Sequence, residues 1–209
     1  MKAREYGIAL NWNYIVISIV VISVLTMLVL YLPGMRDCDT AILKSIRLAL
    51  SPFPSYIPAF VCSFGNAYNI YMFWPQIVAA SVLISHRYYL KTFMLILFTQ
   101  VAILTKDCIK NFVCRTRPCG DEVAGYSFPS GHATASVCFY GILIYIIHTH
   151  IRNDFWRNFL IIVIGIWIFL CCLARLWLGV HFLSDVIAGA FLGFLFVNLY
   201  IIFSKSLNA

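Results

Sequence analysis

Residues 159–203 read FLIIVIGIWIFLCCLARLWLGVHFLSDVIAGAFLGFLFVNLYIIF, two long apolar runs joined by a short segment with Arg175, His181 and Asp185. A helix needs about 20 apolar residues to cross a hydrocarbon core roughly 30 Å thick. The runs at 159–174 and 185–203 come close to this length. They therefore predict two membrane-spanning helices, with ionisable side chains between them at one membrane surface.

The same apolar pattern extends over the whole chain of 209 residues, of which 62% are hydrophobic and 11% charged. Soluble domains carry about 25% charged residues, so this balance indicates a protein dissolved in lipid. We expect six transmembrane helices, at residues 13–32, 66–85, 92–104 (extending towards Ile109), 133–147, 159–174 and 185–203. The predicted fold class is an all-α, polytopic membrane bundle that forms a single domain over residues 1–209.

The region between the first and second expected spans does not fit a transmembrane helix. Residues 39–50 are apolar with Lys44 and Arg47 one turn apart, which favours a short helix lying in the membrane interface. Residues 51–58 hold three prolines, which cannot continue that helix because proline lacks a backbone N–H.

Basic residues are shared unevenly between the two sides of the expected bundle. The loops on the side of the termini hold seven basic and two acidic residues, and the opposite loops hold eight basic and six acidic residues. If three of those eight bind substrate, five remain as topology signals, against seven on the side of the termini. The positive-inside rule then places both termini in the cytoplasm and the other surface outside. The formal net charge of +7 then reflects membrane anchors and topology signals, and we expect no nucleic-acid partner.

Three polar clusters interrupt the chain at the ends of predicted spans. The first is KNFVCRTRP at 110–118, the second is PSGH at 129–132, and the third holds Arg175, His181 and Asp185. Because successive loops alternate between the two membrane surfaces, all three clusters emerge on the same side. Ionisable groups at span ends are costly unless they pair or act, so this convergence predicts a functional site.

The charges in these clusters suit a phosphate group. Lys110, Arg117 and Arg175 supply three positive charges with no matching run of carboxylates, and guanidinium groups bind phosphate oxygens in pairs. Ser130 and Gly131 precede an apolar helix, so their backbone N–H groups are expected at a helix N-terminus, which favours anions. These five residues are the predicted phosphate-binding set.

Two histidines are the predicted catalytic groups. His181 and Asp185 are one helical turn apart, so the carboxylate can hold one imidazole nitrogen and leave the other nucleophilic. His132 has no such partner in the sequence and is expected to protonate the leaving oxygen and then to deprotonate water. The expected reaction is in-line attack by His181 on phosphorus, followed by hydrolysis of the phosphohistidine.

Other polar residues receive simpler interpretations. A lone histidine or arginine near a membrane surface is usually an interfacial anchor. We expect this role for His86, His148 and His150, and an anchoring or supporting role near the first cluster for Lys106, Asp107 and Arg115.

The eight cysteines form no zinc-binding spacing, so neither a metal nor a cofactor is expected. In an oxidising compartment one or two disulfides could form among the cysteines near polar loops, and the sequence does not assign the pairs. These cysteines are Cys38, Cys62, Cys108, Cys114 and Cys119.

Together the three clusters resemble the signature of the type 2 phosphatidic acid phosphatase superfamily: K-x6-R-P, then P-S-G-H, then S-R-x5-H-x3-D. The resemblance covers residues 110–185 and implies the same active-site roles as those argued above. The family's usual serine before the arginine is Ala174 here. We therefore expect either one lost hydrogen bond to phosphate or compensation by Ser127 or Ser184.

This resemblance implies a membrane lipid phosphatase. The family includes enzymes that act on undecaprenyl diphosphate, phosphatidylglycerol phosphate, phosphatidic acid and lipid A, and the small chain looks most like those of the bacterial inner membrane. Among these substrates we place undecaprenyl diphosphate first. The family's soluble vanadium haloperoxidases do not fit the membrane character of this chain.

Two alternatives are an anion or lipid transporter and a non-catalytic lipid-binding relative. A transporter is expected to place its charges near mid-span, often within internal repeats. A non-catalytic relative would not need every catalytic position filled. The oligomeric state is left open.

Overall fold

The computed structural model describes residues 2–63, 70–120 and 123–207, which form eight helices and no strand. The helices are α1 Lys2–Tyr31, α2 Met35–Leu50, α3 Tyr56–Ser63, α4 Ile70–Ser85, α5 Tyr89–Val113, α6 Gly131–His150, α7 Asp154–Trp177 and α8 Leu183–Leu207. Five of them, namely α1, α5, α6, α7 and α8, are long and apolar enough to cross a membrane. The prediction of an all-helical membrane protein is therefore confirmed.

The second expected span, at 66–85, lies partly outside the described residues. Its described part is α4, which has 16 residues and contains Pro75. At 1.5 Å per residue α4 is about 24 Å long, shorter than a typical hydrocarbon core. The sixth span therefore stays a prediction.

Helix α5 is longer than the span expected at 92–104, because it continues to Val113. Its last turns carry Lys106, Asp107 and Lys110, which end the apolar run in the sequence but line one pocket in the structure. The helix stops where Cys114 adopts the left-handed conformation (φ 51°) and donates its backbone N–H to the Lys110 carbonyl. These charged residues therefore lie on a polar face of α5 and do not mark the end of the helix.

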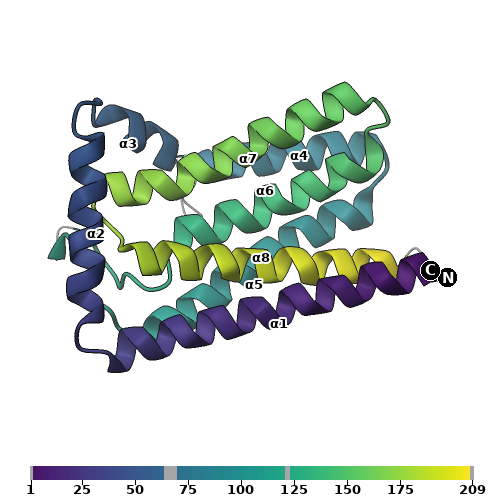
Figure 1. Cartoon of the computed structure of the whole chain (residues 1–209). Helices are drawn as coiled ribbons and strands as arrows, with labels where there is room; N and C mark the ends of the chain where they lie inside the picture. Colours follow the sequence, from purple (N-terminus) through teal and green to yellow (C-terminus); the bar gives the residue numbers. More distant parts are fainter. Residues whose placement is uncertain (1, 64–69, 121–122, 208–209) are drawn as a thin grey trace.

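The long helices lie side by side with α6 at the centre, packed against α5, α7 and α8 (Figure 1). The main core cluster joins buried side chains of α5, α6 and α8, including Leu95, Phe139, Ile142, Leu192 and Tyr200. Helix α1 begins and α8 ends at the same end of the bundle (Figure 1).

Two glycines bring α6 and α8 into unusually close contact. A Cβ atom at Gly189 would lie 2.5 Å from the Ser130 carbonyl oxygen, and one at Gly193 would lie 2.6 Å from the Thr134 carbonyl oxygen. This G-x-x-x-G spacing is typical of helices that approach backbone to backbone in membranes. As a result, the start of α8, with Asp185 of the third polar cluster, lies directly against the start of α6, with the second cluster.

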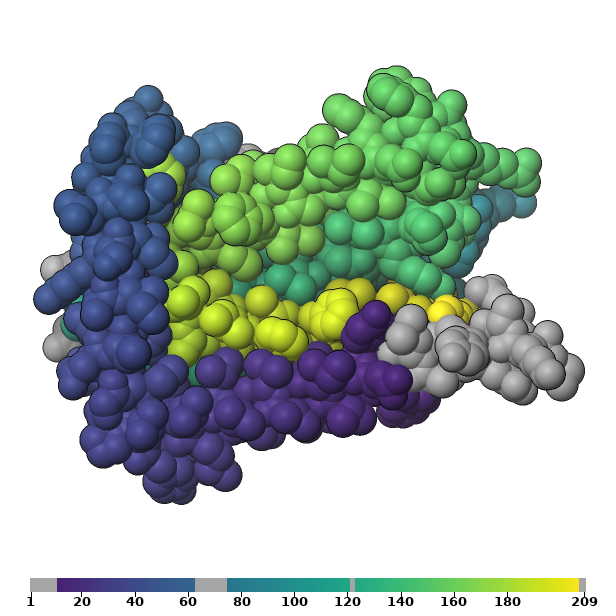
Figure 2. All heavy atoms as spheres, viewed as in Figure 1, coloured from purple at the N-terminus to yellow at the C-terminus, as the bar shows by residue number. Residues whose placement is uncertain are grey.

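Helix α2 crosses the end of the bundle opposite the start of α1 (Figure 1), and Figure 2 shows it as a continuous wall over that end. Its inward face buries Asp39 and Leu43, which are one turn apart. Leu43 packs with Phe182 and Val186 near the start of α8. The helix expected at 39–50 is therefore present and begins four residues earlier, at Met35.

The helix expected at 39–50 does not continue into 51–58, as predicted, because α2 ends at Leu50. A separate short helix, α3, which was not predicted, follows it. It begins at Tyr56 and contains Pro58. Proline is tolerated in the first turn of a helix because its missing N–H would have no intrahelical partner there. Only the first two of the three prolines therefore separate α2 from α3.

Candidate active site

A pocket of about 630 Å³ opens beside the ends of α5, α6 and α7. Six of the eight predicted site residues line it: Lys110, Arg117, Gly131, His132, Arg175 and His181. The other two, Ser130 and Asp185, are fully buried. The three clusters, far apart in the sequence, thus meet at one end of the bundle.

Backbone carbonyls of the surrounding loops hold two of the cations in place. Lys110 donates from Nζ to the Tyr126 carbonyl oxygen. Arg117 donates from Nε to the Gly125 carbonyl oxygen at 2.9 Å and from Nη1 to the Val180 carbonyl oxygen at 3.2 Å. In these contacts between described residues the partners of both cations are neutral carbonyl groups, which leave the positive charges uncompensated.

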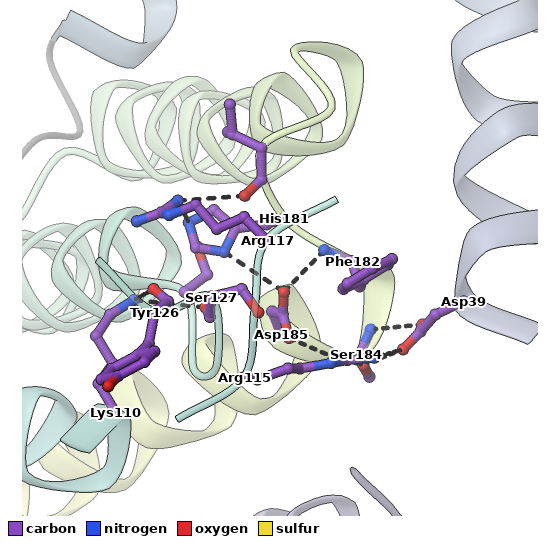
Figure 3. A network of polar contacts seen from close by, with 12 residues as sticks. Asp39, Lys110, Arg115, Arg117, Tyr126, Ser127, His181, Phe182, Ser184 and Asp185 are labelled. Carbon is purple, nitrogen blue, oxygen red and sulfur yellow. Dashed lines mark hydrogen bonds and ion pairs between the residues drawn. The ribbon is translucent and has the colours of Figure 1, made fainter. Parts of the chain in front are cut away.

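His181 lies between this cationic group and Asp185, as Figure 3 shows. Its Nε2 atom is 3.2 Å from Arg117 Nη1, and its Nδ1 atom is 3.5 Å from Asp185 Oδ2. Burial and then the positive charges of Arg175, Lys110 and Arg117 hold the pKa of His181 well below its ordinary value of 6.5. Both effects favour the neutral imidazole, and its Nε2 is turned towards Arg117, which lines the pocket.

The distance of 3.5 Å between His181 Nδ1 and Asp185 Oδ2 is long for a hydrogen bond. Within the described part of the chain, Nδ1 has no other hydrogen-bond partner. Catalytic hydrogen bonds are often long without substrate and shorten in the reacting complex. Asp185 is thus the carboxylate placed to accept a hydrogen bond from the Nδ1–H group.

Asp185 is held by contacts on both oxygens. Its Oδ2 accepts the Phe182 backbone N–H at 2.8 Å, a bond from the residue before α8 to the first turn, as in a capping box. Its Oδ1 accepts from Arg115 Nη1 at 2.7 Å. These two bonds fix the carboxylate opposite the imidazole.

Arg115 also connects Asp185 to α2, through a buried network that the sequence analysis missed (Figure 3). Its Nη1 donates to Ser184 Oγ at 2.7 Å, and its Nη2 donates to Asp39 Oδ2 at 2.8 Å. Asp39 further accepts from the Ser184 hydroxyl and from the Ser184 backbone N–H. Asp39 is only 3% exposed. No periodicity or spacing in the sequence links this aspartate to Arg115 and Ser184, which are 76 and 145 positions away.

The second predicted catalytic histidine, His132, contacts Arg175. His132 is the second residue of α6, and its Nε2 atom lies 3.4 Å from Arg175 Nη1. Because a guanidinium can only donate, His132 accepts at Nε2 in this contact. Arg175 is 8% exposed, and its Nε atom has no hydrogen-bond partner among the described residues. This guanidinium therefore keeps donor capacity for an anion.

Ser130 lies at the N-terminus of α6, as expected, but its backbone N–H already has a partner. Its backbone N–H, expected to bind phosphate, donates to the Asp185 backbone carbonyl at 2.9 Å. Its hydroxyl is buried and unpaired within the described residues. The close α6–α8 contact at Gly189 explains this, because it brings the two backbones within bonding distance. Gly131 does line the pocket, at a helix start whose first N–H groups lack intrahelical acceptors.

The two serines expected to compensate for Ala174 are used elsewhere. Ser127 donates its hydroxyl to the Thr116 carbonyl oxygen at 3.2 Å, and the Ser184 hydroxyl bonds Asp39. Neither side chain lines the pocket. Lys106 does line it: it pairs with Asp107, and its side chain lies beside Gly131. The sequence analysis gave Lys106 only an anchoring or supporting role.

The described residues contain no group of three or more His, Cys, Asp or Glu side chains that could hold a metal ion. All eight cysteines are free thiols, including the five near polar loops whose pairing the sequence left open. Positive charge in the pocket comes from lysine and arginine, which can bind a phosphate directly.

Comparisons with known proteins agree with this architecture. A family model described as the PAP2 superfamily matches residues 88–208, more than half of the chain. Phosphatidylglycerophosphatase B of Bacillus subtilis (strain 168) is 26% identical over 166 residues, which cover 78% of this chain and 81% of the relative. The crystal structure of a transmembrane PAP2-type phosphatidylglycerolphosphate phosphatase from Bacillus subtilis superposes with a TM-score of 0.79. It has 21% identity and covers 94% of this chain and 96% of that chain.

Proposed function

The chain belongs to the PAP2 superfamily, and on this premise we propose that it is a membrane lipid phosphatase that forms a phosphohistidine on His181. The observation that carries this proposal is the position of His181 Nε2. It faces a pocket lined by Lys110, Arg117 and Arg175, while Asp185 lies behind Nδ1. A neutral imidazole backed by a carboxylate and facing three cations suits attack on a phosphate.

In the first chemical step, the His181 Nε2 lone pair attacks phosphorus while the bond to the lipid oxygen breaks. His132 gives a proton to that oxygen, and Asp185 stabilises the positive charge that develops on the His181 ring. Lys110, Arg117 and Arg175, with the Gly131 amide, stabilise the equatorial oxygens.

In the second step, water attacks the phosphohistidine and releases inorganic phosphate. His132 now takes a proton from that water, and His181 leaves as the neutral imidazole with which the cycle began. His132 lies next to Arg175 in the same pocket as His181, and this position supports both of its roles. The chain's own cations supply the charge stabilisation.

We further propose Arg115 and Asp39 as positioning residues. Arg115 bonds Asp185 directly, and Asp39 fixes Arg115 together with Ser184. Both Asp39 and Asp185 are buried. The positive charge of Arg115 between them compensates the negative charge of two carboxylates that would otherwise be costly to bury. Through these contacts, α2 sets the orientation of the carboxylate behind the nucleophile.

The proposed substrate is phosphatidylglycerol phosphate, because the curated relative and the solved structure are both named for its hydrolysis. This replaces undecaprenyl diphosphate as the first choice, and phosphatidic acid and lipid A also remain to be compared. A transporter or a non-catalytic relative is disfavoured, since the ionisable residues line one pocket at one end of the bundle.

We propose that α4 is a sixth, shorter span and that α2 lies in the membrane interface. The crossing of α2 over the helix ends supports this placement (Figure 1), as does its one-sided burial at Asp39 and Leu43. The start of α1 and the end of α8 lie together, away from the pocket, which agrees with cytoplasmic termini and an active site on the outer face of a bacterial inner membrane.

The test is phosphate release by the purified full-length protein in detergent, with phosphatidylglycerol phosphate, phosphatidic acid, undecaprenyl diphosphate and lipid A compared. We expect the first to be hydrolysed fastest, and His181→Ala to release no phosphate from any of them. His148→Ala, at the far end of α6, is the matched control and should keep full activity. Activity retained by His181→Ala would exclude the proposed nucleophile, and loss of wild-type activity with EDTA would exclude the metal-free mechanism.

A further inference from the structure

A second cavity, of about 780 Å³, lies between α4 and α6. Its walls are apolar over most of their length, with Val78, Ala79 and Val82 on α4 and Phe139, Leu143 and Ile147 on α6. This volume is within the range of about 300–1,000 Å³ that is usual for small-molecule sites. None of its lining residues belongs to the active-site pocket.

The cavity occupies the half of the bundle away from the active site. Along α6 its lining runs from Phe139 to His150, a rise of about 17 Å at 1.5 Å per residue. This is close to half of a hydrocarbon core of about 30 Å, the depth of one leaflet. His132 of the active site and His150 are separated by about 27 Å along the same helix.

A fixed positive charge lies where the cavity reaches the end of α6. Lys91 Nζ lies 2.6 Å from His150 Nε2, and it sits over the Tyr88 ring at 4.4 Å from the centroid. Because lysine can only donate, His150 accepts at Nε2. His150 then donates from Nδ1 to the Ile146 carbonyl oxygen at 2.8 Å. Among the described residues, the hydrogen bond of the ammonium to His150 uses one N–H, which leaves two N–H groups as donors for an anion.

We infer that this cavity binds an anionic phospholipid of the leaflet opposite the active site, with acyl chain between α4 and α6 and phosphate on Lys91. The apolar depth fits one leaflet, and the charge at its end is complementary to an anionic head group. Tyr88 and His150, whose rings meet edge to face with centroids 4.9 Å apart, supply polar and aromatic contacts at head-group level. A lipid held here has its phosphate too far from His181 to be the substrate.

The experiment is native mass spectrometry of the full-length protein released from nanodiscs of equal phosphatidylcholine and phosphatidylglycerol. We expect wild-type protein to retain phosphatidylglycerol preferentially, and Lys91→Gln to lower this preference about 5-fold, the effect of one lysine near a membrane surface. Lys205→Gln, which removes a basic residue at the same end of the bundle, should leave the preference unchanged. Leu143→Trp, which fills the cavity, should reduce retention of both lipids.

Arg117→Gln separates this site from the active site, because it removes a cation of the catalytic pocket only. Arg117→Gln should retain phosphatidylglycerol with the same preference as wild-type protein. Equal retention of the two lipids by wild-type protein, an unchanged preference in Lys91→Gln, or a loss of preference in Arg117→Gln would each overturn the inference. The thermal midpoint of each variant shows whether it is folded.

Discussion

Arg115 donates from Nη1 to Asp185 Oδ1 at 2.7 Å, and so joins the loop after α5 to the first turn of α8. The same guanidinium reaches Asp39 of α2 through Nη2. The helix that crosses the end of the bundle is thereby connected to the carboxylate behind His181. In the proposed mechanism, the orientation of His181 therefore depends on Asp39 of α2.

Replacing Asp39 with asparagine should lower kcat about 10-fold with little change in KM, a loss of about 1.4 kcal/mol of transition-state stabilisation. The reason is that Arg115 loses its second carboxylate and holds Asp185 less firmly. Steady-state phosphate release from phosphatidylglycerol phosphate, measured across a pH series, checks this. Asp39→Glu should recover part of kcat.

Asp37→Asn is the matched control, because Asp37 is an exposed acid on the same helix. It should leave both constants unchanged. If Asp39→Asn lowers only the thermal midpoint, and kcat of the folded enzyme equals wild type, Asp39 is structural and not a positioning residue.

The titration of His181 should differ from that of an ordinary histidine. Its pKa in the folded protein is held well below 6.5 by burial and by the nearby cations. The unfolded chain takes up a proton at this residue below about pH 6.5 while the folded protein does not. The free energy of unfolding should therefore fall as the pH is lowered from about 6.5 towards the folded pKa.

NMR of ¹⁵N-histidine-labelled protein, with the His181 signals assigned by His181→Asn, measures this pKa directly. We expect the signals to remain those of the neutral ring at pH 6. A midpoint at or above pH 6.5 would contradict the proposed neutral nucleophile.

The close contact of α6 and α8 predicts a clear difference between two glycines. Gly189→Ala places a methyl group 2.5 Å from the Ser130 carbonyl oxygen and should destabilise the fold by about 1–3 kcal/mol. It should also lower kcat, since the Ser130–Asp185 backbone bond is next to it. Gly165→Ala, whose Cβ would meet nothing within 4 Å, should be close to neutral. Thermal unfolding in detergent compares them, and equal midpoints would refute the packing argument.

Much of this fold could be predicted from apolar run length alone. Helices α7 and α8 follow from residues 159–203, because a polar segment between two long apolar runs has few alternatives in lipid. The length of α5 could not be predicted in this way, since Lys106 and Lys110 end its apolar run while facing a pocket that only tertiary structure creates. The prolines correctly predicted the end of α2 at Leu50, but no apolar run of spanning length marked the short helix α3 that follows.

The candidate site shows a similar division. Residues 110–118, 129–132 and 175–185 could be found because ionisable groups are rare in an apolar chain, and the structure brings most of them to one pocket. The partner of the Ser130 amide could not be foreseen, because this amide reaches the Asp185 carbonyl only through the α6–α8 contact. Asp39 was equally hidden, since an acid on an amphipathic helix is ordinarily solvent-exposed.

The most direct test of the account is to trap the covalent intermediate. Wild-type protein and His132→Ala would be mixed with substrate carrying ³²P in its terminal phosphate, quenched in alkali, and mapped by peptide. We predict an alkali-stable, acid-labile label on the peptide that contains His181 in wild-type protein, and none in His181→Asn. In His132→Ala the label should appear more slowly, because the leaving oxygen is not protonated, and should also decay more slowly, because the hydrolysis step lacks the base. Turnover by wild-type protein and His132→Ala without label in either, or a label on another residue, would contradict attack by His181.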